Sequence, residues 1–239
     1  GLRPVFAVYA TFLSRAFDQV NLDVGLHGQP VVFCLDRAGI TGDDGASHHG
    51  VLDMVLLSKV PGMTVFAPSS YQELQQMLHD ALDITHGPVA IRYPKTPAPS
   101  VGEEEVGHGV AARKTRTGSD VCILAVGKML AAAQQAADRL VEEGISCSVW
   151  DVRAVTPLDP AMIDDAAGHE LVVTVEDGIR VGGCGSAIRD LLSDKDPGPA
   201  AVRVLGVPIE YIPHGSADQI LADLGLDADG IIDTIHASR

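Results

Sequence analysis

The chain of 239 residues has no apolar run approaching the roughly 20 residues that a membrane-spanning helix needs. Basic residues are scarce, because 17 Lys and Arg stand against 32 Asp and Glu and give a net charge of −15. This excess of negative charge repels phosphate backbones and argues against sequence-independent binding of nucleic acid. We therefore expect neither a membrane nor a nucleic-acid partner. A small anionic ligand stays compatible with a few local arginines.

Paired cysteines are absent as well. The four cysteines are Cys34, Cys122, Cys147 and Cys184. No C-x-x-C spacing occurs among them, and three of the four lie in or beside apolar stretches. This pattern predicts buried free thiols in a reducing cytoplasm. The adjacent His48 and His49 are no metal signature, because neighbours in an extended segment point to opposite sides. We expect no metal ligands in this chain.

What is present is an alternation of strand and helix patterns. Strands are expected at 5–9, 31–35, 64–67, 89–93, 121–126, 145–150, 171–175 and 202–207. Helices are expected at 13–24, 51–57, 70–83, 130–141, 185–192 and 216–224. Ser70 and Glu73 have the spacing of a capping box, which marks the start of the third of these helices. Such an alternation predicts an α/β fold with mostly parallel sheets flanked by helices.

The composition shifts in the middle of the chain. Residues 96–100 contain two prolines, and three consecutive glutamates follow at 103–105. Such a stretch is typical of a solvated connector. We expect two domains, at 1–97 and 118–239, joined by a linker at 98–117. One long surface loop within a single domain is the alternative.

The segment D-R-A-G-I-T-G-D-D-G-A-S-H-H-G at 36–50 directly follows an expected strand. Ligands collect at the carboxyl ends of parallel strands, and glycines let a backbone approach a ligand closely. Within the segment, Arg37 offers a phosphate clamp, Asp44 a carboxylate for hydroxyl groups and His48 an imidazole for proton transfer. Singly, each residue also fits a turn or a surface position; together on one loop, they predict a site.

Several segments carry a family resemblance. Y-A-T-F-L-S-R-A-F-D-Q at 9–19, the D-R-A-G-x-x-G-x-D-G-x-x-H block at 36–48 and A-I-R-Y-P-K at 90–95 closely resemble the 1-deoxy-D-xylulose-5-phosphate synthase family. The resemblance covers essentially the whole chain and includes V-E-D-G at 175–178. It implies a transketolase-like pyrimidine-binding domain followed by a transketolase C-terminal-like domain. Transketolases and the β subunits of 2-oxoacid dehydrogenases resemble the chain more loosely.

The activity that this resemblance implies is a condensation. Pyruvate and D-glyceraldehyde 3-phosphate give 1-deoxy-D-xylulose 5-phosphate and CO2, the first step of non-mevalonate isoprenoid synthesis and a source of thiamine and pyridoxal precursors. The implied cofactors are thiamine diphosphate, which supplies the electron sink, and Mg²⁺. The family further implies a cytoplasmic homodimer. A non-catalytic dimerisation module with the same fold is the alternative of another class.

Two aromatic residues match the family's cofactor contacts. Phe12 lies just past an expected strand, where its ring could stack on the aminopyrimidine, although a core position is the alternative. Tyr9 ends that strand and could contact the cofactor and hydrogen-bond a reaction intermediate. The resemblance assigns catalytic contacts with the acceptor's oxygens to Asp44 and His48.

Two arginines match the phosphate contacts. Arg37 and Arg92 end or follow different strands, so a parallel sheet can bring them together around the acceptor's phosphate. Arg15 is a possible further contact, with a solvated helix face as its alternative. Lys95 is given no role.

Two parts of a complete site are missing from these residues. In the family, the glutamate that activates the aminopyrimidine stands shortly before the segment matching Gly1, and the G-D-G…N signature for Mg²⁺ and diphosphate lies in an N-terminal domain. We therefore expect a fragment, a processed product or half of a split enzyme. It would need an N-terminal diphosphate-binding domain as partner and be inactive without it.

Overall fold

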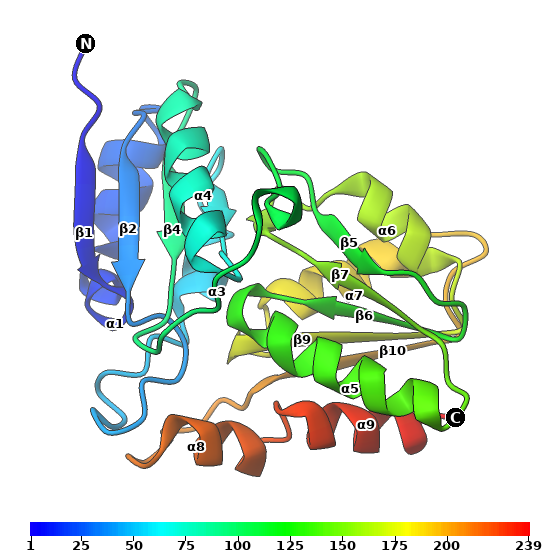
Figure 1. Cartoon of the computed structure of the whole chain (residues 1–239). Coiled ribbons are helices and arrows are strands. Elements are labelled where there is room, and N and C mark those ends of the chain that lie inside the picture. The colour runs from blue at the N-terminus through cyan, green and yellow to red at the C-terminus, as the bar shows by residue number, and fades with distance from the viewer.

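A computed structural model describes all 239 residues (Figure 1). The strands are β1 (Val5–Tyr9), β2 (Val32–Asp36), β3 (Thr64–Phe66), β4 (Val89–Arg92), β5 (Arg113–Arg116), β6 (Val121–Ala125), β7 (Cys147–Asp151), β8 (Ala154–Thr156), β9 (Leu171–Ile179) and β10 (Ala201–Val207). The α-helices are α1 (Ala10–Leu13), α2 (Phe17–Gln19), α3 (Asp53–Leu57), α4 (Tyr71–Asp83), α5 (Leu130–Glu142), α6 (Pro160–Ala167), α7 (Cys184–Ser193), α8 (Ala217–Asp223) and α9 (Ala228–His236). No helix is both long and apolar enough to cross a membrane.

The strands form two five-stranded sheets, in the orders β1-β2-β4-β3-β8 and β10-β9-β6-β7-β5. All neighbours are parallel except at one edge of each sheet, where β8 runs antiparallel to β3 and β5 antiparallel to β7. The expected α/β fold with two mostly parallel sheets is confirmed. The sheets lie side by side, the first on the left of Figure 1 and the second on the right.

The two sheets share a core. Helix α4 covers one face of the first sheet through a small apolar cluster that includes Phe66 and Met77. A larger cluster joins residues of the first sheet and its helices, such as Leu35 and Met54, to residues of the second sheet and its helices, such as Leu124 and Ile188. Apolar burial across a junction removes the freedom of two domains to move independently. The two halves of the chain are thus packed as one body.

Helix α4 begins where the sequence predicts, because the Ser70 hydroxyl accepts a hydrogen bond from the Glu73 backbone N–H at 3.1 Å. The expected helix at 13–24 is instead a succession of α1, a 3₁₀ turn (Ser14–Ala16), α2 and a π-helical stretch (Val20–Gly25). Helices α6 and α9 were not among the expected elements. Strand β5 lies inside the segment expected as a linker, so the second sheet begins before residue 118.

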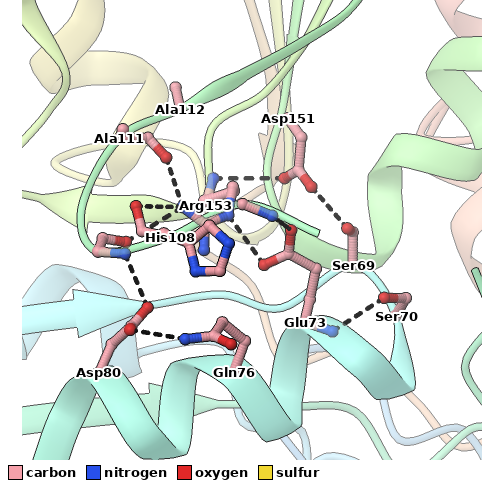
Figure 2. A network of polar contacts seen from close by, with 12 residues as sticks. Ser69, Ser70, Glu73, Gln76, Asp80, His108, Ala111, Ala112, Asp151 and Arg153 are labelled. Atoms are coloured by element: carbon pink, nitrogen blue, oxygen red, sulfur yellow. Dashed lines mark hydrogen bonds and ion pairs between the residues drawn. The ribbon is translucent and has the colours of Figure 1, made fainter. Parts of the chain in front are cut away.

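A buried ion pair holds the point where the chain crosses between the sheets (Figure 2). After β7 the chain leaves the second sheet, and Arg153 precedes β8, which belongs to the first. The Arg153 guanidinium donates to the Glu73 carboxylate at 2.8 Å and to the carbonyl of Gly109 at 3.1 Å. Glu73 also accepts from the backbone N–H of Gly107 at 2.7 Å, so its side chain does not complete the capping box. This Arg153 network fixes the connector to both sheets.

Candidate functional site

The carboxyl ends of β1, β2 and β4 carry the residues singled out in the sequence. The loop after β2 is closed by two backbone hydrogen bonds between Gly39 and Gly50, at 2.9 and 2.8 Å. Gly39 has a φ of 75°, and a Cβ there would lie 1.8 Å from the Asp177 carboxylate of β9. Only glycine fits both demands. The second sheet therefore supports the base of the loop.

Four side chains contact one another in succession at these strand ends. The Arg37 guanidinium carbon lies 3.9 Å from the centre of the Tyr9 ring, and Arg37 takes a φ of 58° and also pairs with Asp36. The Tyr9 and Phe12 rings are stacked, with centres 5.4 Å apart at 12°. Phe12 meets the imidazole of His48 edge-on, again at 5.4 Å. The order Arg37, Tyr9, Phe12, His48 thus places a cation and an imidazole at the two ends of an aromatic pair.

Asp44 and Lys95 complete this group. The Lys95 ammonium lies 2.9 Å from the Asp44 carboxylate. The hydrogen bond and charge of Lys95 lower the pKa of Asp44, and His48 and Arg37 add smaller contributions in the same direction. Asp44 is thus an ionised carboxylate within electrostatic reach of both residues. We call Tyr9, Phe12, Arg37, Asp44, His48 and Lys95 the strand-end cluster.

Arg92 belongs to a separate, buried network of ion pairs. Its Nε donates to Asp53 at 2.8 Å and its NH1 to Asp177 at 2.6 Å, and only 3% of its side chain is exposed. Burial alone lowers the pKa of Arg92, but the two carboxylates outweigh it and hold that pKa above its usual range. The Lys128 ammonium approaches Asp177 at 3.8 Å. We call Arg92, Asp53, Asp177 and Lys128 the Arg92 network.

The clamp of Arg37 and Arg92 stays a prediction, and in this structure each of the two guanidinium groups pairs with carboxylates of the chain. Arg92 is the last residue of a strand buried on both faces, and Asp177 of the second sheet captures its guanidinium. Lys95, three residues farther along, is the cation that reaches Asp44. Sequence reasoning missed it, although it closes the same A-I-R-Y-P-K segment. Arg15 is exposed, makes no hydrogen bond or ion pair and does not join the cluster.

Two further groups of polar side chains are held by hydrogen bonds and ion pairs within the protein. The G-G-C-G-S turn before α7 holds the buried carboxylate of Glu176, which accepts from the N–H groups of Cys184 and Gly185 at 3.0 and 2.8 Å, so that helix start has no room for a phosphate. Burial raises the pKa of Glu176 to about 8.

A second group holds possible metal ligands. Ligand atoms of Cys122, Asp165 and His169 lie within 4.8 Å of one another. The carboxylate there pairs with Lys114 and both imidazole nitrogens face backbone oxygens, so we assign no metal.

Comparison with known families finds two matches along the chain. Residues 1–100 match the model described as "Transketolase, pyrimidine binding domain", and residues 110–231 match "Transketolase, C-terminal domain". The strand-end cluster lies entirely within the first match. Asp177, which supports the base of its loop, lies within the second.

Among curated relatives, the chain is 45% identical to a 1-deoxy-D-xylulose-5-phosphate synthase of Thermobifida fusca over 97% of this chain and 37% of the relative. It is 46% identical to one of a Parafrankia species, over 95% of this chain and 35% of the relative. It therefore spans little more than a third of the length of these relatives. A solved structure described as "Split gene transketolase, inactive beta4 tetramer" superposes with a TM-score of 0.90 at 29% identity, covering 99% of this chain and 76% of that one.

Proposed function

From the premise that the chain belongs to the transketolase family, we propose that it supplies the pyrimidine-binding and C-terminal domains of a 1-deoxy-D-xylulose-5-phosphate synthase. The complete enzyme would condense pyruvate with D-glyceraldehyde 3-phosphate and release CO2. One observation carries the proposal: the block at 36–48 gathers a cation, a carboxylate and an imidazole beside the exposed ring of Phe12 and the partly buried ring of Tyr9. That set suits a phosphorylated hydroxyaldehyde.

The acceptor's phosphate would be bound by Arg37 and Lys95. Both side chains are partly exposed, at 27% and 38%, and each already holds a carboxylate that a phosphate can replace. Guanidinium and ammonium groups form the stronger, charge-assisted hydrogen bonds with phosphate oxygens. When the phosphate takes Lys95, Asp44 is released to accept from a hydroxyl group. His48, whose Nδ1 lies 2.9 Å from the Ser47 hydroxyl, would face the aldehyde oxygen and exchange its proton.

Thiamine diphosphate is the cofactor that this arrangement fits. Phe12 is 43% exposed at a strand end beside Tyr9, so its ring offers exposed surface on which an aminopyrimidine could stack. When bound, the cofactor would supply the electron sink for the carbanion left by decarboxylation. The strand-end cluster offers only one carboxylate, Asp44, and it is paired with Lys95. We propose that Mg²⁺ and the diphosphate are held by an N-terminal domain.

The exposed edge of the first sheet supports the need for partners. Edge strand β1 exposes half of Val5 and Phe6, and Leu26 of the same domain is 74% exposed. Apolar surface of this kind marks a contact with another protein surface. We propose that the N-terminal domain and a second copy in a homodimer cover it, and that the chain without them is inactive; the tetrameric structural neighbour is likewise described as inactive. The free thiols fit a reducing cytoplasm.

A binding and reconstitution experiment tests this proposal. Thiamine diphosphate is titrated calorimetrically, with and without Mg²⁺, into the chain alone and then into its mixture with a separately supplied N-terminal half. We expect tight, Mg²⁺-dependent binding only in the mixture, together with formation of 1-deoxy-D-xylulose 5-phosphate from labelled pyruvate. Tight binding by the chain alone would contradict the partner proposal. A mixture that binds the cofactor but uses a longer sugar phosphate or a lipoyl group as acceptor would point to a transketolase or 2-oxoacid dehydrogenase instead.

A further inference from the structure

A pocket of about 400 Å³ opens at the edge of the second sheet, away from the residues of the strand-end cluster. Edge strand β10 forms one wall, and the turn after β9, helix α7 and helix α9 contribute the rest. Three of its nine lining residues are arginines: Arg180 after β9, Arg189 on α7 and Arg203 on β10. No acidic residue lines it. This composition is unusual in a chain with nearly two acidic residues for each basic one.

These arginines also differ from those of the buried networks in their partners. Arg92 and Arg153 are neutralised by carboxylates, whereas Arg180, Arg189 and Arg203 form no ion pair. Guanidinium groups around one cavity repel one another, so an anion that enters gains from all of them. Arginines without an ion pair also keep terminal guanidinium donors for such a ligand.

Hydrogen bonds hold two of the three arginines in place. Arg180 donates its N–H to Val207 at 2.9 Å, and its carbonyl accepts from the Ser186 hydroxyl at 2.6 Å. Arg203 uses its Nε on Ser238 at 3.0 Å, which leaves its two terminal nitrogens free. The hydroxyl groups of Ser186 and Thr234 are occupied by backbone carbonyls. The guanidinium nitrogens are therefore the donors that the pocket offers.

The size and charge of the pocket favour a small ligand over a second copy of the chain. About 400 Å³ is within the range of small-molecule sites, which is roughly 300 to 1,000 Å³. A symmetric pairing of two copies across this pocket would place arginines against arginines, with no acidic residue in the lining to offset their repulsion. We propose that this pocket binds a small, multiply charged anion of the phosphorylated-metabolite class, independently of the strand-end cluster.

Calorimetric titration with inorganic pyrophosphate tests this site on the full 239-residue chain. The variant Arg189→Gln/Arg203→Gln should weaken binding about tenfold or more, because it removes hydrogen bonds to a charged group. Arg3→Gln/Lys59→Gln is the matched control, since it removes two exposed charges that are in no ion pair and lie outside the pocket lining. Arg37→Gln/Lys95→Gln reports binding at the strand-end cluster. Both of these should stay within about twofold of the wild type, because neither touches the pocket.

Several results would overturn the site. They are the absence of saturable binding to the wild type, unchanged binding in Arg189→Gln/Arg203→Gln, an equal loss in Arg3→Gln/Lys59→Gln, and a loss confined to Arg37→Gln/Lys95→Gln. Sedimentation velocity adds a further arm. If the wild type self-associates and Arg189→Gln/Arg203→Gln does not, the arginines form an interface between copies and the metabolite site is wrong. Because all the substituted side chains are exposed or partly exposed, urea unfolding midpoints should coincide and exclude misfolding as the cause.

Discussion

Arg37 and Arg92 stand at the ends of neighbouring parallel strands, yet they occupy opposite kinds of environment. Arg37 lies over the Tyr9 ring with 27% of its side chain exposed, whereas Arg92 is enclosed between Asp53 and Asp177. The strand-end cluster can exchange its internal carboxylates for a ligand's charge. The Arg92 network cannot, because any group removed from it leaves an uncompensated buried charge. The comparison teaches that burial, and not residue type, divides binding from structural roles here.

The largest expected effect comes from breaking the buried side of this comparison. Asp177→Ala should lower the free energy of unfolding by about 3–5 kcal/mol, because it strands the Arg92 guanidinium in the core. Urea denaturation at pH 7 measures it. Asp229→Ala, which removes the partner of Arg139 in an exposed pair, is the matched control and should cost less than about 1 kcal/mol. Equal losses for the two variants would remove the distinction between the regions.

The second effect is a pH dependence of the unfolding free energy that arises from a buried carboxyl group. Burial raises the pKa of Asp151 to about 7 in the folded chain, well above its value when unfolded. The folded state therefore binds this proton more tightly, and the stability from this group is complete below about pH 4 and is lost as the pH rises to about 7. Asp151→Asn keeps an acceptor for the Ser69 hydroxyl and should remove this dependence.

Urea denaturation from pH 4 to 8 measures the difference between Asp151→Asn and the wild type. That difference should grow with pH by an amount on the order of 3 kcal/mol. Asp44→Asn, at an exposed carboxylate of the strand-end cluster, should show no such growth, because solvent screens its ion pair with Lys95. A pH-independent difference for Asp151→Asn would mean that its carboxyl group is ionised throughout.

The third effect concerns the exposed strand-end cluster and is measured as kcat/KM in the assembled enzyme. Arg37→Gln or Lys95→Gln should each cost about 1.5–3 kcal/mol in kcat/KM for the phosphorylated acceptor, because each loses a hydrogen bond to a charged group. The loss should be small with pyruvate as the varied substrate. Lys59→Gln, at an exposed cation outside the cluster that is in no ion pair, serves as control. A similar loss for both substrates would show that these cations do not read the phosphate.

The smallest effect concerns the aromatic pair. Phe12→Ala should weaken thiamine diphosphate binding in the assembled enzyme by about 1 kcal/mol, or roughly fivefold, through lost ring stacking. The unfolding free energy of the chain should change by less than about 0.5 kcal/mol, because the ring is half exposed. Tyr71→Ala removes an equally exposed ring elsewhere and should leave cofactor binding unchanged. An unaltered affinity for Phe12→Ala would separate this ring from the cofactor.

Much of the fold followed from the sequence because the signals are local. The eight expected strands are present, and the hydroxyl of Ser70 starts α4 as its spacing predicts. Expectations were wrong where a distant partner overrode a local rule. The Glu73 side chain pairs with Arg153, which lies 80 residues away, instead of completing the capping box. Strand β5, which reads R-K-T-R, looked like a connector because an edge strand needs little apolar character.

The sequence by itself determined the alternation of strands and helices and the glycine-rich loop at a strand end, because periodicity and turn chemistry act over a few residues. It also placed Tyr9, Phe12, Arg37, Asp44 and His48 at the same sheet edge. Only the tertiary structure decided which cation faces outward. Arg92 is held by an aspartate 85 residues farther along, and Lys95 takes the exposed place beside Asp44. A guanidinium becomes structural when buried carboxylates surround it, and that enclosure exists only after the two sheets have packed together.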